Sequence, residues 1–303
     1  MEYILKTDRL TKKYGRKVVL NGLEINVPKG SIYGLIGPNG AGKTTFMRII
    51  SGLSSPSSGN YVINGISSSD KKASKTAAKF SAIIEKPAFY EGISVYSNMV
   101  AQCDIRGVKN YDCIMELLKL VKLDKETTTR AHNLSLGMKQ RLGIAMALVG
   151  DAEIIILDEP MNGLDPEGII DIRNLILKLN KEKGITFIIS SHILDELSRV
   201  ANVFGFIRKG QILKEINQNQ LHEQGSVYTS ISTDNNSLLI TILDKKNLKY
   251  SIEDNDTVYV YSELTLEEIM PELSKNNIKL RSISTFTESL ESIYLNVMKG
   301  ENV

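Results

Sequence analysis

The sequence predicts an α/β protein built around a parallel β-sheet and followed by a smaller α+β domain. A strand over Ser31–Ile36 runs into a glycine-rich loop, a helix over Phe46–Ile50 and a strand over Tyr61–Asn64, and this order is typical of a parallel sheet. Two further apolar runs, Ile154–Leu157 and Ile185–Ile189, are continuous rather than alternating. Continuous runs indicate strands that are buried on both faces.

Length and composition indicate two domains. The chain has 303 residues, of which 42% are hydrophobic, and single domains commonly contain ~100 to 200 residues. We expect an N-terminal domain over residues 1–220 and a C-terminal α+β domain over residues 221–303, where Asn, Ser, Thr and Tyr become more frequent. A ferredoxin-like arrangement is one candidate for this smaller domain. Its expected elements are strands near Val227–Ser232, Val258–Tyr261 and Lys279–Ser284, helices between them, and a terminal helix over Glu288–Met298.

Other segments of the N-terminal domain have their own periodicity. Apolar and polar residues alternate between Leu5 and Val27, which indicates strands. Helical spacing over Ser94–Leu123 and a further helix over Gly137–Val149 indicate a helical subdomain inserted at about residues 91–152. An amphipathic helix is expected over Gly168–Lys183, between the two apolar strands.

Charge and apolar content exclude several classes of protein. The 37 Lys and Arg residues against 35 Asp and Glu give a net charge of +2, which lacks the basic excess of a dedicated nucleic-acid binder. No apolar stretch approaches the roughly 18 residues that span a bilayer, and the N-terminus carries charges where a signal peptide needs an apolar region. We therefore expect a cytosolic protein whose cysteines, Cys103 and Cys113, are reduced thiols.

The strongest functional signal is the glycine-rich stretch GPNGAGKTT, which matches the P-loop pattern G-x-x-x-x-G-K-[ST] between a predicted strand and a predicted helix. Glycines let successive backbone N–H groups turn toward a phosphate. Lys43 is expected to reach the β- and γ-phosphates, and the Thr44 hydroxyl to bind Mg²⁺. The residues expected to bind the nucleotide here are Gly37, Pro38, Asn39, Gly40, Ala41, Gly42, Lys43, Thr44 and Thr45.

Two acidic residues follow the apolar strand that ends at Leu157. Open α/β sheets place ligands at the carboxyl ends of their strands, so these side chains should lie near the phosphate loop. We expect Asp158 to bind Mg²⁺ and Glu159 to act as the base that polarises the attacking water.

These motifs and their order resemble the ABC transporter ATPase family from about Leu5 to Leu213. Tyr14, in TKKYG, matches the aromatic residue that stacks on adenine in this family. The segment LSLGMKQR looks like the family signature, with Ser135 and Gly137 at the start of a helix whose N–H groups can face a γ-phosphate. It departs from the usual pattern at Leu136 and Met138, where glycine and glutamine are usual.

Two more motifs extend the resemblance. Asn162-Gly163-Leu164-Asp165 matches the loop through which two ATPase domains communicate across their dimer interface, so Asp165 is expected near nucleotide. His192, just past an apolar strand, corresponds to the switch histidine that contacts the γ-phosphate.

The resemblance implies a RecA-like parallel sheet with an N-terminal antiparallel β subdomain and an inserted α-helical subdomain. It also implies an ATPase that uses ATP and Mg²⁺ and pairs head to tail with a second ATPase domain, as a homodimer. Each ATP would lie between the Lys43 loop of one copy and the Ser135–Gly137 signature of the other. The partner would be an integral membrane permease, and the location the cytoplasmic face of the membrane.

Glu85 points to one subfamily of the ABC transporter ATPases, because most members of the family carry glutamine at this position. A carboxylate can bind Mg²⁺ or orient water, so Glu85 is a candidate metal ligand and catalytic residue. Together with PAFYEG and LSLGM, it resembles the subfamily that exports bacitracin-like and lantibiotic peptides or protects their producers. ATP-driven export or removal of such a peptide is the function expected.

Three alternative functions compete with this prediction, and the sequence disfavours the second and third. An ABC ATPase of an exporter or importer for another substrate would carry the same motifs. A soluble ABC ATPase acting on DNA or ribosomes would need long insertions or a second ATPase domain, which do not fit in 303 residues. A regulatory nucleotide-binding module would lack the base or the switch residue, whereas Glu159 and His192 are both present.

Overall fold

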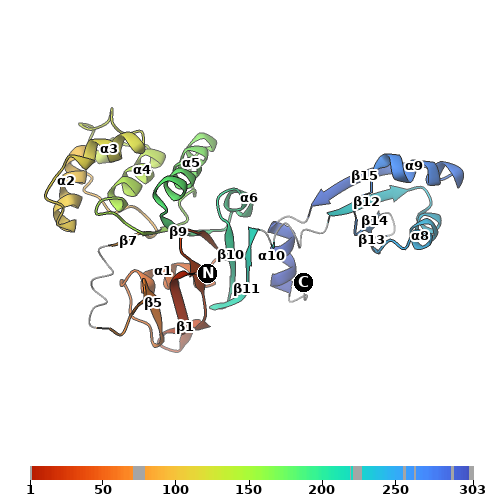
Figure 1. Ribbon diagram of the computed structural model, residues 1–303, viewed down its shortest axis with the longest axis horizontal. Coiled ribbons are helices and arrows are strands. Elements are labelled where there is room, and N and C mark those ends of the chain that lie inside the picture. Colours follow the sequence, from red (N-terminus) through yellow and green to blue (C-terminus); the bar gives the residue numbers. More distant parts are fainter. Residues whose placement is uncertain are drawn as a thin grey trace. The chain divides into compact units, whose positions relative to one another are not determined.

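The computed structural model describes residues 2–70, 79–218, 220, 227–254, 257–262, 264–287 and 290–299 (Figure 1). Contacts between Cα atoms divide the chain into two compact units, Met1–Gln218 and Asn219–Val303. The division falls two residues before the predicted boundary at Gln220.

An antiparallel sheet opens the first unit. Its strands lie in the order β2-β1-β5-β6, and β3 also pairs with β1. The mixture of apolar and polar residues explains the sheet, because Leu5 and Leu10 of β1 are buried in the core while Lys6, Asp8 and Arg9 between them are exposed. The strands are β1 (Tyr3–Tyr14), β2 (Lys17–Leu23), β3 (Asn26–Pro28), β5 (Ser58–Ile63) and β6 (Ile66–Ser67).

A six-stranded sheet forms the centre of the first unit, in the order β11-β10-β4-β9-β8-β7. All neighbours are parallel except the β10–β11 pair. Every residue of β4, β8 and β9 is buried, as their continuous apolar runs predict. The loops that follow these three neighbouring strands therefore meet at one edge of the sheet. The strands are β4 (Ile32–Ile36), β7 (Phe80–Ile83), β8 (Ile154–Asp158), β9 (Thr186–Ser191), β10 (Val203–Arg208) and β11 (Gln211–Asn217).

Helices cover this sheet and form a subdomain beside it. Helix α1 packs on β8, α5 packs on β9, and α4 contacts α2, α3 and α5 (Figure 1). The expected parallel-sheet core, antiparallel subdomain and inserted helices are confirmed. The helices of this unit are α1 (Lys43–Ile50), α2 (Val95–Arg106), α3 (Cys113–Leu120), the 3₁₀ helix η2 (Ala131–Asn133), α4 (Leu136–Ala147), α5 (Pro166–Lys183) and α6 (Leu194–Ser198).

The predicted helical stretch Ser94–Leu123 is interrupted in the structure. Gly107 takes a left-handed conformation with φ of 71° and ends α2, and α3 begins only at Cys113. Left-handed glycine is a common helix terminator, since it lacks the Cβ that makes this conformation costly. Helical spacing continued across the gap, so periodicity alone did not locate the break.

The second unit is a four-stranded antiparallel sheet with the order β13-β14-β12-β15. Its chain order is βαββαβ, and the two central strands, β12 and β14, belong to different halves. This is the ferredoxin-like arrangement considered above. The prediction missed β13. Leu221, where the predicted domain begins, and Glu288, where the predicted terminal helix begins, lie outside the described residues. The elements are β12 (Val227–Thr233), α8 (Asn236–Lys245), β13 (Tyr250–Asp254), β14 (Thr257–Val260), α9 (Leu266–Lys275), β15 (Leu280–Thr287) and α10 (Leu290–Lys299).

A hydrogen-bonded pair, the buried Tyr33 and the half-buried Glu215, connects β4 to β11 within the first unit. The fully buried Tyr33 donates its hydroxyl hydrogen to Glu215 Oε1 at 2.6 Å, and the Asn26 backbone N–H donates to the same oxygen at 3.3 Å. Burial raises the pKa of Tyr33, and burial also raises the pKa of Glu215 although both hydrogen bonds act to lower it. The Tyr33 hydroxyl therefore stabilises a carboxylate that the protein interior disfavours.

Tyr33→Phe is expected to lower the free energy of unfolding by about 1–3 kcal/mol at neutral pH, because it removes a hydrogen-bond donor from the half-buried Glu215 carboxylate. The pKa of Glu215 is higher in the folded protein than in the unfolded chain. Ionisation of Glu215 therefore lowers the free energy of unfolding as pH rises through the folded-state pKa. The stability that Tyr33→Phe removes should therefore be smaller below the usual carboxyl pKa of 4.5, where Glu215 is protonated in both the folded and the unfolded protein. Urea unfolding at both pH values measures it. Tyr61→Phe, a half-buried tyrosine in the same unit, is the control, and an equal loss there would contradict the explanation.

Candidate active site

The phosphate loop lies between β4 and α1, and two of its glycines are required by geometry. Gly42 precedes the first residue of α1 with φ of 113°, a conformation that side chains rarely adopt. A Cβ on Gly37 would lie 2.3 Å from the Ile207 carbonyl oxygen. The loop therefore closes tightly against β10, and the N-terminus of α1 supplies unpaired N–H groups and positive potential.

Lys43 is buried at the start of α1, with its ammonium group inside the loop. Its Nζ donates to the Gly37 carbonyl oxygen at 2.6 Å and lies 3.7 Å from Glu159 Oε1. A lysine in this position needs an anion, and the nearest one is a single carboxylate. The group is therefore placed to exchange these contacts for phosphate oxygens.

Thr44 and Asp158 come together at the carboxyl end of β8. The Thr44 hydroxyl donates to Asp158 Oδ2 at 2.8 Å, and the Ser190 hydroxyl donates to Asp158 Oδ1 at 2.5 Å. A hydroxyl and a carboxylate are oxygen ligands that suit Mg²⁺, which usually takes few protein ligands and keeps water or phosphate oxygens besides. Within the described ranges no group of three or more His, Cys, Asp or Glu side chains is arranged so that it could hold a metal ion.

Glu159 and His192 form a second polar pair beside this group. Glu159 has a left-handed backbone with φ of 52°, held by hydrogen bonds from its N–H to the Ser190 carbonyl and hydroxyl oxygens. Its Oε2 lies 2.7 Å from His192 Nδ1. Backbone strain of this kind is common at functional sites, and here it turns the carboxylate toward Lys43.

The pocket at this edge has a volume of about 690 Å³. Its lining contains the predicted residues Pro38 to Thr45 and Glu159, but also residues that the sequence did not indicate. The unpredicted ones are Lys17, Val18, Val19 and Lys209.

Tyr14 and Gly37 are predicted nucleotide-binding residues of this region that do not line the pocket. Gly37 lies at the base of the loop, and Tyr14 lies to one side. Tyr14 is half exposed at the end of β1, and the Lys12 ammonium lies 5.0 Å from the centre of its ring. Its hairpin neighbours Lys17 and Val18 line the pocket instead.

A separate recess gathers the signature and the Asp165 loop. Ser135 caps α4 by accepting the Met138 N–H at 3.3 Å, and Asp165 caps α5 by accepting the Gly168 N–H at 2.9 Å. Both residues line this recess of about 390 Å³ together with Gly137 and the exposed Leu136. Two helix N-termini thus face one hollow, which favours an anion there.

Glu85, a predicted Mg²⁺ ligand, does not contact Thr44 or Asp158, the other two predicted Mg²⁺ ligands. It has a left-handed backbone with φ of 65°, and its Oε1 pairs with Arg48 Nη2 at 2.8 Å. Arg48 lies on α1, so this pair connects Glu85 to the helix that follows the phosphate loop. Both side chains are largely exposed.

Comparison with known proteins identifies the family. Residues 20–162 match the family described as ABC transporter. The whole chain is 36% identical to the bacitracin transport ATP-binding protein BcrA of Enterococcus faecalis and covers 99% of it. This chain belongs to the ABC transporter ATP-binding family. It is also 43% identical, over 70% of its length, to the lantibiotic transport ATP-binding protein SrtF of Streptococcus pyogenes, of which 90% is covered.

Solved structures agree with this assignment. The crystal structure of the ADP conformation of MJ1267, an ATP-binding cassette of an ABC transporter, superposes with a TM-score of 0.66 at 25% identity, covering 73% of this chain and 93% of that one. A dimeric post-hydrolysis cassette bound to ADP and phosphate shares the fold, with a TM-score of 0.63 at 24% identity, covering 70% and 98% of the two chains. The predicted family resemblance is confirmed, and this chain is an ABC ATPase that binds and hydrolyses ATP.

Proposed function

We propose that this chain is the ATP-hydrolysing subunit that energises export or removal of a bacitracin-like or lantibiotic-like peptide through a separate membrane permease. The observation that carries the proposal is the similarity to BcrA along the entire chain, which includes the second unit as well as the ATPase unit. Glu85 and Leu136, which depart from the usual family pattern, are the supporting features of the sequence.

In this proposal the phosphate loop holds ATP and Lys43 contacts its β- and γ-phosphates. Thr44 and Asp158 would hold Mg²⁺, which when bound neutralises charge that develops on the phosphates. The Ser190 hydroxyl orients Asp158 by its 2.5 Å hydrogen bond. Asp158 is buried, so this contact fixes the direction in which its carboxylate points.

Glu159 would accept a proton from the attacking water, and His192 would contact the γ-phosphate. The 2.7 Å contact between Glu159 Oε2 and His192 Nδ1 supports a joint role, because the histidine fixes the orientation of the carboxylate. Lys43 lies 3.7 Å from the other carboxylate oxygen and would shift to the phosphates when ATP binds.

We further propose a head-to-tail homodimer, in which the recess of Ser135, Gly137 and Asp165 meets the ATP bound by a second copy. The recess and the Lys43 pocket share no lining residue, so one chain supplies two different faces. Two helix N-termini aimed at the recess would bind the γ-phosphate of the partner's ATP.

The permease would dock on the loop that follows Glu85, at the cytoplasmic face of the membrane. This loop exposes Tyr90 and Ile93, and the buried Asn98 holds it: its side chain accepts the Tyr90 N–H at 2.7 Å and donates to the Tyr90 and Ser94 carbonyl oxygens. A rigid apolar loop suits a short amphipathic helix. No helix in the described part of the chain is long and apolar enough to cross a bilayer.

Arg48→Ala tests whether Glu85 takes part in metal binding. Releasing the carboxylate from Arg48 is expected to lower the Mg²⁺ concentration for half-maximal ATP hydrolysis by up to about fivefold, since exposed ion pairs contribute about 0.2–1 kcal/mol. Arg48→Lys, which can keep the pair, is the control. An unchanged Mg²⁺ dependence in both Arg48→Ala and Glu85→Gln would remove Glu85 from the metal site.

The proposed function is tested by growth inhibition with a panel of bacitracin-like and lantibiotic peptides. Cells would express this chain with its neighbouring permease genes, as wild type or as Glu159→Gln. Protection that the variant loses supports ATP-driven removal of the peptide. Protection in neither strain would remove the peptide assignment and leave transport of another substrate, in either direction, as the alternative.

A further inference from the structure

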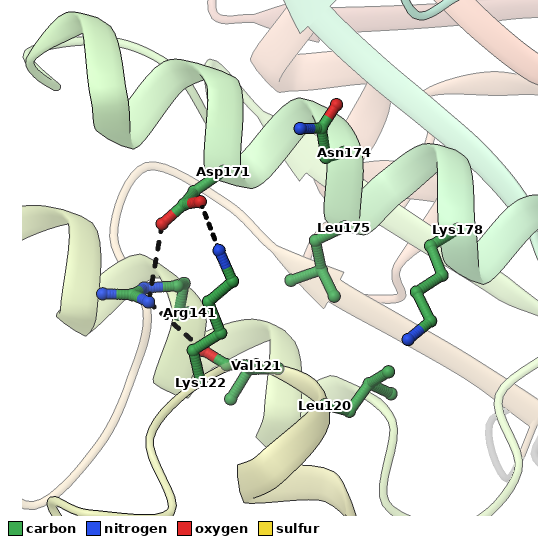
Figure 2. Close-up of a pocket in the computed structure, with 8 residues that line it drawn as sticks. All are labelled: Leu120, Val121, Lys122, Arg141, Asp171, Asn174, Leu175 and Lys178. Carbon is green, nitrogen blue, oxygen red and sulfur yellow. Dashed lines mark hydrogen bonds and ion pairs between the residues drawn. The ribbon is translucent and has the colours of Figure 1, made fainter.

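A small pocket lies between α5, α4 and the turn that follows α3 (Figure 2). Three of its charged side chains converge on one point. Asp171 projects from α5, and Figure 2 shows Lys122 and Arg141 directed at it from the helical subdomain. The catalytic groups around Lys43 and Glu159 do not line this pocket.

Each oxygen of the Asp171 carboxylate has its own cation. Lys122 Nζ lies 2.8 Å from Oδ1, and Arg141 Nη1 lies 3.6 Å from Oδ2. Arg141 also donates to the Val121 carbonyl oxygen at 3.5 Å. The Lys122 side chain is 70% exposed, whereas those of Arg141 and Asp171 are only 18% and 24% exposed. The Arg141–Asp171 pair is therefore the less screened of the two.

The same pair borders the signature recess. Arg141 and Asp171 line the hollow that contains Ser135, Gly137 and Asp165, as well as the pocket of Figure 2. Arg141 lies in the second turn of α4 and Asp171 in the second turn of α5. The pair thus connects the two helices one turn behind the N-termini that face the recess.

We propose that Asp171 is a positioning residue for ATP hydrolysis: by holding Arg141, it keeps the first turn of α4, with Ser135 and Gly137, aligned with the Asp165 loop. The inference rests on the proposed role of this recess in binding the γ-phosphate of a second copy's ATP. Without the carboxylate, Arg141 and Lys122 face each other as like charges and α4 loses its ionic contact with α5. The helix can then tilt away from the Asp165 loop.

Asp171→Asn removes the charge at almost constant size. We expect kcat for ATP hydrolysis to fall about 10-fold, since misplacement of a contributing group by about 1 Å can cost about 10²-fold. The KM for ATP should stay within about twofold, because the phosphate loop is untouched. Asp171→Glu should recover most of the loss. Asn174→Ala is the matched control, since Asn174 is exposed one turn along the same helix and lines the same pocket.

A second measurement follows the helix itself, without nucleotide. Amide hydrogen exchange in α4 should be faster in Asp171→Asn than in the wild type or Asn174→Ala. Unchanged exchange would show that Asp171 does not hold α4, and faster exchange with unchanged kcat would show that the contact has no role in hydrolysis. Either result overturns the proposal. A wild-type chain that protects cells from no peptide would count against the proposed function alone, because exchange and kcat need no peptide.

Discussion

Glu159→Gln is expected to lower the turnover number for ATP hydrolysis by about 10²- to 10⁴-fold while ATP binding persists. Glutamine has the size of glutamate but cannot accept the proton of the attacking water. The contacts proposed to bind phosphate come from the loop and Lys43, and the variant leaves these groups in place. A large loss in kcat with a small change in ATP affinity is therefore the signature of a base.

The measurement is steady-state phosphate release together with equilibrium binding of ATP. Glu196→Gln is the matched control, because Glu196 belongs to a half-buried ion pair with Arg173 at 3.1 Å elsewhere in the same unit. It should leave kcat within about threefold of the wild type, since a half-buried ion pair outside the site affects stability more than chemistry. If Glu159→Gln keeps more than about a tenth of the wild-type turnover, the base lies elsewhere.

The sequence predicted which residues come together around Lys43, because they lie in two short contiguous segments of the chain. The residues of the loop Gly37–Thr45 determine its local geometry. Asp158 ends, and Glu159 follows, a strand that its continuous apolar run predicts. Chain order then places the ends of β4 and β8 at one sheet edge. No tertiary contact needs to be known for this inference.

Ser190 shows what sequence reasoning missed. A serine at the end of an apolar strand carries no signal of its own. Its role follows only from the register of β8 with β9, which sets Asp158 opposite Ser190. That single pairing lets one hydroxyl bind the Asp158 carboxylate and the Glu159 N–H. Strand register depends on packing across the whole sheet, which a single sequence does not specify.

The sequence also could not predict which way the side chains of Tyr14 and Glu85 point. Both residues occupy the motif positions that the resemblance indicates, but Tyr14 contacts Lys12 and Glu85 contacts Arg48. Motif spacing fixes where a backbone passes, whereas exposed side chains choose among partners of similar energy. Their roles in binding adenine and Mg²⁺ stay predictions.

Lys43→Met is expected to weaken ATP binding by about 12- to 140-fold, since hydrogen bonds to charged groups contribute about 1.5–3 kcal/mol and 1.4 kcal/mol is tenfold in affinity. Methionine keeps an unbranched stem of similar length, so the buried channel of Lys43 stays filled. The lost contact is the one that Nζ now makes with the Gly37 carbonyl oxygen and would make with the phosphates. Turnover should fall as well, because Glu159 also loses its nearest cation.

Thermal unfolding with and without ATP separates lost binding from lost folding. A ligand stabilises the native state by an amount that depends on its concentration relative to Kd, so a 100-fold weaker affinity removes about 2.7 kcal/mol of ATP-dependent stabilisation. Lys209→Met is the control, because Lys209 lines the same pocket but is exposed. An equal loss in Lys209→Met would mean that the net charge of the pocket governs affinity. If only Lys43→Met loses ATP-dependent stabilisation, then a directed contact from Lys43 inside the loop governs affinity. Water screens an exposed charge such as Lys209 far more than a buried one.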